Sequence, residues 1–520
     1  MYTEQDGRCE ALESLSVVRS HEPATETPRQ KRPLRAYLAV FGGFLLMFNS
    51  WGMVNAYGTY ASIYKQELLP SVTILLSNLV GSTQTSFILL LSSIVGRLLD
   101  AGFSMHLKVV GTVCTTLSPI LLSFVNGDGH YNDGKYDLIL LVQGILWAIG
   151  MGCFFVTSST VAVSWYREGK GLIVGMVASG ASIAGLVFPI AIRYLEPDLG
   201  FNNTMRVVAG IVGGTGIIAC LIANPNPDHP LRKPDNWLDY HVWVDPTARK
   251  NKSYCWYTAS IAFVFLGFYA IFFNLEEWAV STGVGYKTEP LPGMESHSIR
   301  TTFLLAVMNG CSTVGRLSSS YLCDLFGALA VHSSVTFVAA VLTMCLWPFA
   351  TNLSAALGFV ITFGIFSGSV IGLPPACVAT ILGPDEQHRL GQWVGMMYTA
   401  AGIPALVGPI IAGYITSKHG YIGVQMWSGT CLVFAALCMA MAWWNQKSSQ
   451  DKMKWLEEQK RRLSFESAKL LTQRRISVIS LKDTFSFESL VKTFTRRSSV
   501  QKESADTVAD EKVVTEKEIV

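Results

Sequence analysis

Gly175 to Pro189 read GMVASGASIAGLVFP, and Gly395 to Pro409 read GMMYTAAGIPALVGP. Both stretches open on Gly-Met, are apolar and interrupted by small residues, and close on proline at the same spacing. A Gly-rich apolar helix that recurs after roughly 220 residues indicates that a membrane unit was duplicated, as in carriers built from two similar halves.

The composition around these stretches is that of a membrane protein. Of 520 residues, 50% are hydrophobic, 11% aromatic and only 15% charged, whereas soluble proteins carry about 25% charged residues. The charges cluster at the two ends and in short loops, leaving windows of about twenty apolar residues, each long enough to cross a bilayer. We therefore expect a polytopic helical membrane protein.

The apolar windows form two sets of six on either side of a polar linker. They fall near 36–58, 79–98, 107–125, 138–160, 171–192, 204–223, 256–275, 301–322, 328–349, 354–380, 391–415 and 421–444. The fold predicted is an all-α membrane protein with twelve transmembrane helices in two six-helix bundles. The expected parts are a disordered cytoplasmic N-terminus 1–35, bundles 36–223 and 256–444, a cytoplasmic linker 224–255 and a disordered cytoplasmic tail 445–520.

Basic residues predict the orientation. They gather in the leading segment and in the central linker, namely Arg29, Lys31, Arg32 and Arg35, then Arg232, Lys233, Arg249, Lys250 and Lys252. Because Lys and Arg mark cytoplasmic loops, we expect a multi-pass protein of the plasma membrane with both termini in the cytoplasm.

Several residues match modification patterns. Asn202 and Asn352 open glycosylation sequons in loops expected to face outward. Ser464, Ser477 and Ser499 each end an Arg-Arg-x-Ser match in the basic tail. A kinase acting on these serines would weaken the attraction of the tail to anionic lipid; the alternative is a solvated segment without this role.

Other classes of function lack their motifs. The eleven cysteines show no metal-ligand spacing, so we expect no metal and no other cofactor. No phosphate-binding Gly-x4-Gly-Lys-Ser/Thr loop and no catalytic constellation appears, which argues against ATP-driven transport and against an enzyme. A net charge of +3 and the mixture of acids and bases in the tail make nucleic acid an unexpected partner.

Two loops carry related short motifs. An acid ends each at Asp100 and Asp324, four residues after a small residue, Gly96 or Ser320. This placement resembles the cytoplasmic signature of the major facilitator superfamily, in which the acid pairs with neighbouring helix ends in one conformation. The signature's basic residues directly after the acid are missing at 101–103, which implies a weaker latch.

Within that superfamily the chain resembles the monocarboxylate porter family, in particular its fungal members. The resemblance rests on Asn49 to Gly58 in the first helix, on Trp165 to Arg167 before the run Gly171 to Pro189, and on Gly315-Arg316 in the eighth helix. It covers most of the region 35–444. It implies a carrier of organic acids that works by alternating access.

Arg316 is the leading candidate for substrate contact. Ionisable residues within membrane helices usually face a water-filled path or a partner, and Asn309, Ser312 and Arg316 share one helix face. The family resemblance implies that this arginine contacts the substrate carboxylate, to which a planar guanidinium can bind in bidentate fashion. The alternatives are that Arg316 reaches the headgroups or pairs with Asp324.

Two departures from the lactate carriers of the family affect the expected cargo. Those carriers have an acid one turn before the arginine, and this chain has Ser312 at that position. They also have a lysine in their first helix, which has no counterpart here between Ala36 and Tyr60. Lactate is therefore not the expected substrate, and proton coupling is left open.

A set of other polar and aromatic residues lies within the expected helices. They are Asn49, Asn55, Gln84, Gln143, Trp147, Asn274 and Tyr398. Each alone fits a helix-to-helix hydrogen bond or a packing contact. Together they suggest a polar and aromatic cavity for a substrate larger than lactate.

The Gly-rich fifth and eleventh helices are expected to form the surfaces on which the halves move, because glycine allows close backbone approach. The residues concerned are Gly175, Gly180, Gly185 and Pro189 in one and Gly395 and Pro409 in the other. Gly96 and Asp100 after the second helix, and Asp324 after the eighth, are the other residues expected to act in the conformational change. Leucine at Gly180 or Gly185 should abolish transport without loss of surface expression.

The function predicted is secondary transport of small to medium organic acids, with efflux of a secondary metabolite favoured. Uptake of a monocarboxylate or vitamin-like nutrient, and a transporter-derived nutrient sensor, are the alternatives. The partners expected are the organic acid, the lipid bilayer and a tail kinase, with a proton left open.

Overall fold

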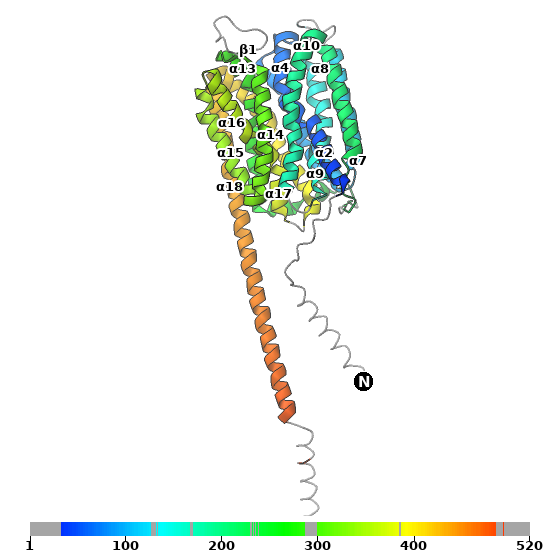
Figure 1. Ribbon diagram of the computed structural model, residues 1–520, viewed down its shortest axis with the longest axis vertical. Coiled ribbons are helices and arrows are strands. Elements are labelled where there is room, and N and C mark those ends of the chain that lie inside the picture. Colours follow the sequence, from blue (N-terminus) through cyan, green and yellow to red (C-terminus); the bar gives the residue numbers. More distant parts are fainter. Residues whose placement is uncertain are drawn as a thin grey trace, which may run out of the picture. The chain divides into compact units, whose positions relative to one another are not determined.

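The computed structural model describes most of the chain. The described residues are 33–125, 132, 134–166, 170–228, 231, 233–234, 236–237, 239–286, 299–383, 386–484 and 492. Contacts divide the chain into two units, 1–446 and 447–520. The first unit is the membrane domain, and it consists almost entirely of helices that run side by side (Figure 1).

The first half of the membrane domain comprises residues 34–222. Its elements are α2 Leu34–Asn49, α3 Trp51–Asn55, α4 Tyr57–Ile63, the π-helix η1 Tyr64–Leu68, α5 Ile74–Leu90, α6 Ser92–Asp100, α7 Ser104–Val125, α8 Tyr136–Ile139, the π-helix η2 Leu140–Trp147, α9 Ala148–Val163 and α10 Lys170–Ile222. The long α10 consists of two helical parts joined at Gly200. The φ of Gly200 is 71°, a left-handed conformation that glycine adopts without a steric penalty.

The linker and the second half follow. Their elements are α11 Tyr240–Trp243, α12 Pro246–Lys250, α13 Lys252–Ser281, β1 Gly285–Tyr286, β2 Ile299–Arg300, α14 Thr301–Phe326, α15 Ala328–Cys345, the 3-10 helix η3 Trp347–Phe349, α16 Leu353–Gly372, α17 Pro374–Leu382, the 3-10 helix η4 Gln387–Arg389 and α18 Leu390–Thr484. The two short strands pair in parallel, with Gly285 opposite Ile299. Gly420, with a φ of 67°, divides α18 as Gly200 divides α10.

Two local features follow from proline and asparagine. Pro374 marks a break between two helices, because α16 ends at Gly372 and α17 begins at Pro374, a first-turn position that proline tolerates. The side chain of Asn352 caps α16 by accepting a 2.8 Å hydrogen bond from the backbone N–H of Ala355.

Each predicted apolar window lies on one helix, on two or three consecutive helical elements, or on one part of α10 or α18. Within the described residues, nine helices are long and apolar enough to cross a membrane. The helix α14 has 26 residues but is more polar, since one face carries Asn309, Ser312 and Arg316.

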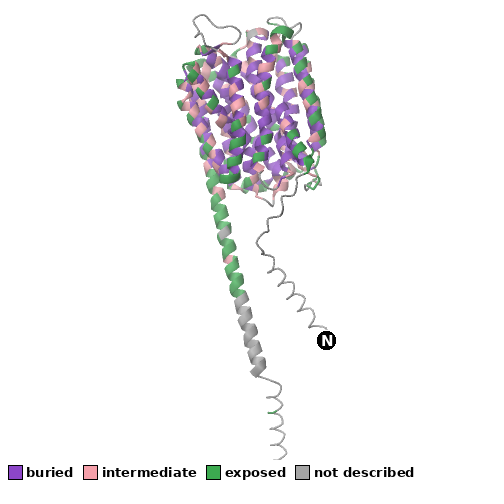
Figure 2. Ribbon diagram, in the orientation of Figure 1, coloured by how far each residue is buried: buried purple, intermediate pink, exposed green. Residues whose placement is uncertain are grey.

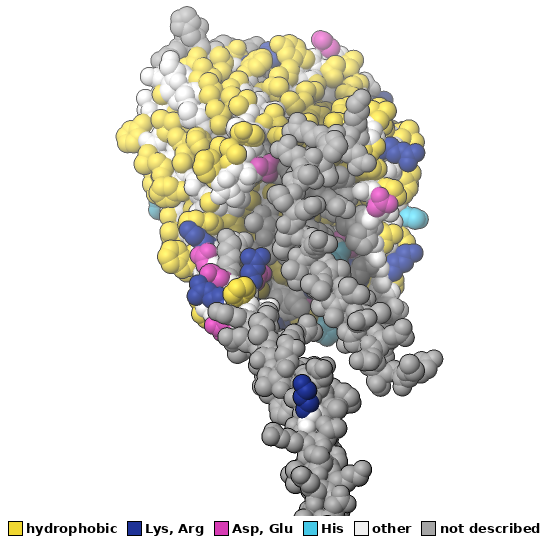
Figure 3. All heavy atoms as spheres, turned by 60° about the horizontal axis from the view of Figure 1, so that its bottom comes forward, with side chains coloured by type: hydrophobic (Ala, Val, Ile, Leu, Met, Phe, Trp, Pro, Cys, Tyr) yellow, Lys and Arg dark blue, Asp and Glu magenta, His cyan; other side chains and the backbone are white. Residues whose placement is uncertain are grey.

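Burial separates central from peripheral helices. The apolar window in Leu34–Asn55 is 78% buried, whereas the windows in α7 and α15 are each only 39% buried. Figure 2 shows exposed residues along the outer helices and buried ones toward the interior. In Figure 3 apolar side chains cover much of the side of the domain, and charged side chains gather toward its lower end. The exposed apolar faces fit lipid contact.

The tail unit departs from the expected disorder in its described part. Residues 445–484 continue α18 as helix. This stretch contains no Gly or Pro and is rich in Lys, Glu, Gln and Leu, which are strong helix formers. Ser464 is exposed on this helix, whereas the side chain of Ser477, all of Ser499 and nearly all of segment 1–35 lie outside the described residues.

Candidate functional site

The first half contacts the second half along α10 and α14. A methyl group added at Gly185 would lie 2.6 Å from Cγ of Asn309, and one at Gly175 would lie 2.7 Å from the carbonyl oxygen of Arg316. Any side chain at these two positions would therefore push α14 away. The contact places Asn309 and Arg316 against α10, on the shared face that the sequence predicted.

Two polar contacts cross the seam between α10 and α14. Ser182 and Ser312 are joined through their hydroxyls at 2.5 Å. Arg316 donates a 2.8 Å hydrogen bond from Nη1 to the carbonyl of Ala178. The arginine is only 4% exposed, and among the described residues its buried Nε has no hydrogen-bond partner. In this structure Arg316 is therefore buried against α10.

Aromatic rings fill the centre between the halves. Phe155 of α9 stacks on Trp51 at a centroid distance of 4.5 Å and meets Tyr398 of α18 at 4.7 Å. Trp51 Nε1 donates to the hydroxyl of Tyr269 in α13. Tyr269 and Tyr398 both lie near Arg316. The cluster therefore joins four helices beside the buried guanidinium.

A narrow crevice leads toward this cluster. It is lined by Phe155, Val156, Ser159, Thr160, Val163, Lys170, Val174, Pro375, Ala376, Ala379, Leu390, Val394 and Tyr398. Its free space is about 10 Å³, room for about one water molecule. The described part of this lining is mostly apolar, and Lys170 is the one charged residue in it. The halves must separate before an organic molecule can enter.

Arg316 lies beyond the inner part of the crevice. Ala178, which accepts its hydrogen bond, is one helical turn from the lining residue Val174. On the opposite side, a methyl group at Gly372 would lie 3.4 Å from Cγ of Arg316. Gly372 is likewise four residues from the lining residue Ala376. A molecule that passed along the crevice would next meet the guanidinium.

A second seam joins α6 to α18. A methyl group at Gly395 would lie 2.8 Å from Cα of Ser93, and the backbone N–H of Ser93 donates to the hydroxyl of Thr399 at 3.0 Å. Gly96 faces the backbone of Gly391. Farther along, Asn78 donates to the carbonyl of Pro409 at 3.5 Å.

Asp100 caps this seam. Its Oδ2 accepts a 2.9 Å hydrogen bond from the backbone N–H of Gln392 in the first turn of α18. A carboxylate there satisfies an otherwise unpaired donor and opposes the positive end of the helix dipole. The related acid Asp324 is exposed and lies beside Gly171, where a methyl group would be 3.0 Å from its Oδ1. The two acids thus occupy matching places at the starts of α18 and α10.

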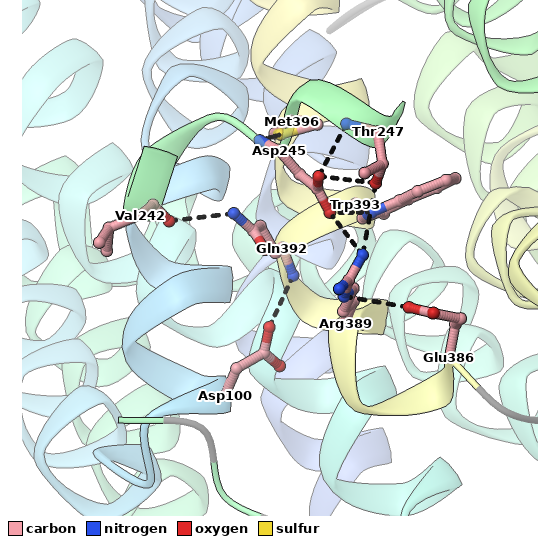
Figure 4. Close-up of polar contacts among 9 residues, drawn as sticks. All are labelled: Asp100, Val242, Asp245, Thr247, Glu386, Arg389, Gln392, Trp393 and Met396. Carbon is pink, nitrogen blue, oxygen red and sulfur yellow. Dashed lines mark hydrogen bonds and ion pairs between the residues drawn. The ribbon is translucent and has the colours of Figure 1, made fainter. Parts of the chain in front are cut away.

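The linker docks on the same first turns of α18 (Figure 4). Asp245 accepts hydrogen bonds from Trp393 Nε1 at 3.0 Å, from the Thr247 hydroxyl at 2.7 Å and from Arg389 at 3.3 Å. Burial acts to raise the pKa of Asp245, but these hydrogen bonds and the charge of Arg389 outweigh it and lower the pKa below its usual value. Asp245 therefore remains ionised at neutral pH.

Gln392 joins three parts of the domain. Its backbone N–H binds Asp100 of the first half, and its side chain donates to the carbonyl of Val242 in the linker at 3.0 Å. Leu390 and Val394, in the same turns, line the crevice. This set, Asp100, Val242, Asp245, Arg389, Gln392 and Trp393, is called the linker-end gate below.

Four other predicted site residues serve packing within one half. Asn49 donates to the Val212 carbonyl at 3.3 Å. Asn274 donates to the carbonyl of Ala270 in its own helix at 2.8 Å. Asn55 donates to the Ala181 carbonyl at 3.4 Å, although it also borders Gly185. Buried Pro189 lies within α10.

Gly180 differs from its predicted placement. A side chain there would collide with the carbonyl of Phe44 in α2, in the same half, and not with α14. The fifth helix presents Gly175 and Gly185 to the other half, and Gly180 to its own.

Gln143 and Trp147 lie on the π-helix η2. Tyr64 donates to Oε1 of Gln143, and Tyr60 packs edge-on to Trp147 at 6.1 Å. Both contacts stay within the first half. Short π-helical segments are frequent at functional sites, but these side chains do not reach the crevice lining.

Sequence reasoning did not single out Lys170, Phe155, Asp245 or Gln392. The signal for Lys170 was its place directly before the Gly171 run. Neither Phe155, within an all-apolar window, nor Asp245, within a polar linker, differs from its neighbours in a way that spacing reveals.

Long apolar helices that run side by side, with an arginine buried among them, place the chain among helical membrane proteins. Residues 39–391 match the family profile described as Major Facilitator Superfamily. The chain belongs to this family.

Curated relatives agree with this assignment. The chain is similar to the aspyridones efflux protein of Emericella nidulans, with 25% identity over 82% of each chain. It is similar to the agnestins efflux protein of Paecilomyces divaricatus, with 26% identity over 81% of this chain and 89% of the relative. An MFS-type transporter of Penicillium oxalicum is 27% identical over 83% of this chain and 99% of the relative.

Proposed function

We propose that this carrier exports an amphipathic organic acid, a secondary metabolite, across the plasma membrane by alternating access. The observation that carries the proposal is the buried guanidinium of Arg316, which lies between the halves, one turn beyond an apolar crevice. The apolar lining suits the body of such a molecule, and the guanidinium suits its acid group.

The proposal includes twelve spans in two six-helix bundles. Counting the two parts of α10 and of α18 separately, and adding α14 to the apolar helices, gives that number. The end that bears the linker-end gate is the cytoplasmic one, because the linker carries Lys233, Arg249 and Lys250. Both termini are then cytoplasmic.

In the proposed cycle, separation of the halves at the linker end breaks the bond from Arg316 to Ala178. The guanidinium then faces the widened crevice, where the unpaired Nε and the neighbouring Nη2 bind the carboxylate in bidentate fashion. Closure of the linker-end gate and opening of the opposite end release the molecule outside. The substrate-contact role corresponds to that of monocarboxylate porters.

Export is favoured over uptake because relatives with similar chains are efflux proteins by name. The coupling ion is not assigned to Ser312, which occupies the position of the porters' acid, because its hydroxyl is bonded to Ser182.

Transport assays in inside-out vesicles test the role of Arg316. The probes are 1-naphthylacetate, an aromatic acid, and its neutral amide. We expect Arg316→Ala to reduce transport of the acid about tenfold or more, the effect of losing a charged hydrogen bond. Arg316→Lys should retain part of it, since lysine is a point charge without the planar fork.

Arg206→Ala is the matched control, because Arg206 is an exposed arginine on the second part of α10. Unchanged transport of the acid in Arg316→Ala, or equal losses in both alanine variants, would refute the proposed contact.

A further inference from the structure

Lys170 stands at the mouth of the crevice and bridges the two halves. It is the first residue of α10, and its Nζ donates a 2.9 Å hydrogen bond to Oε1 of Gln387 in η4. We infer that Lys170 captures the organic anion at the cytoplasmic entrance and that this capture itself releases the bond across the mouth. The inference rests on the proposed export of an organic acid.

Gln387 is firmly attached to the second half. Its Nε2 donates to the carbonyl of Ala379 at 3.0 Å and also to that of Gly383. A hydrogen bond from Lys170 to Gln387 therefore connects α10 of the first half to the end of α17. Breaking this bond removes one tie between the halves at the place where the crevice opens.

A wider vestibule adjoins the mouth. Its volume is about 280 Å³, and it shares Lys170, Ala376 and Ala379 with the crevice. This volume approaches the lower end of the range for small-molecule sites, about 300 Å³. Lys170 thus lies where a roomy space meets the narrow apolar path, so an anion held there has its apolar body directed at the crevice.

The charges around Lys170 favour an anion from solution. Among the residues that the structure describes, the crevice has no other charged lining residue. Within the same described residues, the vestibule lining contains one acid, Asp324, which is exposed to solvent and whose repulsion is therefore screened. The ammonium group is half-buried, which strengthens its attraction for an incoming carboxylate relative to bulk water.

Lys170 should exchange its hydrogen-bond acceptor from Gln387 to the organic anion. A carboxylate is a stronger acceptor for an ammonium group than a neutral amide oxygen, so an anion displaces Gln387. Because the displaced bond exists only when the halves are closed at this point, the anion binds the open state better and shifts the population toward it. Lys170 selects anions at the mouth, and Arg316 holds them at the centre.

Kinetics in inside-out vesicles separate capture from translocation. Lys170→Met should raise the KM for 1-naphthylacetate about tenfold, as expected for losing a charged hydrogen bond, with little change in kcat. The KM for the neutral amide should stay within about twofold. Lys170→Arg should keep the low KM of the unmodified chain. Gln387→Ala should not raise the KM, because this change removes only the acceptor that competes with the anion.

Lys250→Met, at an exposed linker lysine, is the control. An unchanged KM for the acid in Lys170→Met, or an equal rise for acid and amide, would overturn the inference. A normal KM in Lys170→Met together with lost transport in Arg316→Ala would defeat this inference alone. Normal transport of the acid in Arg316→Ala would defeat the proposed function instead.

Discussion

The backbone N–H of Gln392, in the first turn of α18, donates a 2.9 Å hydrogen bond to Oδ2 of Asp100 at the end of α6. This bond holds together the first half and the helix that forms one wall of the crevice. Val394 of the same helix lines the crevice. Loss of the bond at Asp100 should therefore be detected as faster labelling of a Val394→Cys variant.

Removing the cap should open the crevice. Asp100→Asn keeps an acceptor but loses the charge near the helix N-terminus, which should weaken the cap by about 0.5 to 1 kcal/mol. Asp100→Ala loses both the acceptor and the charge, which should weaken the cap by about 1 to 2 kcal/mol. In inside-out vesicles, maleimide should label Val394→Cys slowest when Asp100 is present, faster with Asp100→Asn and fastest with Asp100→Ala. Labelling of the parent without the Val394→Cys change gives the background from native cysteines, and equal rates in all three would contradict the cap's role.

Leucine at Gly185 and at Gly180 should fail for different reasons. At Gly185 the new side chain meets Asn309 of the opposite half at 2.6 Å and Asn55 of its own half at 2.9 Å. Both neighbours are side chains and not backbone, so the protein should fold in nearly normal amounts and yet lose transport. At Gly180 it meets the backbone of Phe44 in the same half, and overpacking of about 1 to 3 kcal/mol or more should lower the yield of folded protein. Size-exclusion profiles and flux separate the outcomes; identical behaviour of the two variants would argue against this assignment.

Asp245 should hold the linker without pH dependence over the physiological range. Its lowered pKa means that its contribution is fully present above the ordinary value of 3.8 and is lost only as pH falls through the still lower folded value. Maleimide reacts with the thiolate, so labelling of Val394→Cys rises with pH in every variant. The ratio of the labelling rates with and without Asp245→Asn should therefore exceed one and stay constant between about pH 5 and 8. Asp239→Asn is the control, because Asp239 caps α11 through the N–H of His241. A ratio that changes with pH over this interval would count against the prediction.

Glu67 should make stability depend on pH. Burial and its hydrogen bond with the side chain of Glu196 raise the pKa of Glu67 from 4.5 to about 7, against the opposing effect of Arg193. The folded protein therefore favours the protonated acid, and this stabilisation is full below the ordinary pKa and is lost as pH rises through about 7. Between pH 4.5 and about 7, Tm should therefore decrease less in Glu67→Gln than in the unmodified chain. An equal dependence of Tm on pH in both proteins would exclude Glu67 as the cause of the decrease.

The sequence by itself located the elements of the fold well. Apolar windows marked the helices because a segment that crosses a bilayer must be apolar over about twenty residues, whatever its neighbours. It also predicted close packing at Gly175, Gly185 and Gly395, and the family resemblance implied that Asp100 pairs with a helix end. These assignments depend on local composition and on spacing along one helix.

The sequence was less informative about the tail and about single polar residues. The absence of Gly and Pro in 445–484 allows a helix where charge alone suggested disorder. Asn49 and Asn274 bind backbone carbonyls nearby, and spacing does not separate such residues from those that face a path.

The sequence alone determined that this protein is a helical membrane carrier with a repeated Gly-rich helix and a candidate arginine at position 316. Only the tertiary structure decided which neighbours these residues have: Arg316 against Ala178, Lys170 against Gln387, and the linker against α18. The physical reason is that apolarity and helix periodicity are properties of consecutive residues, whereas a hydrogen bond across two halves depends on how helices far apart in the chain are packed together.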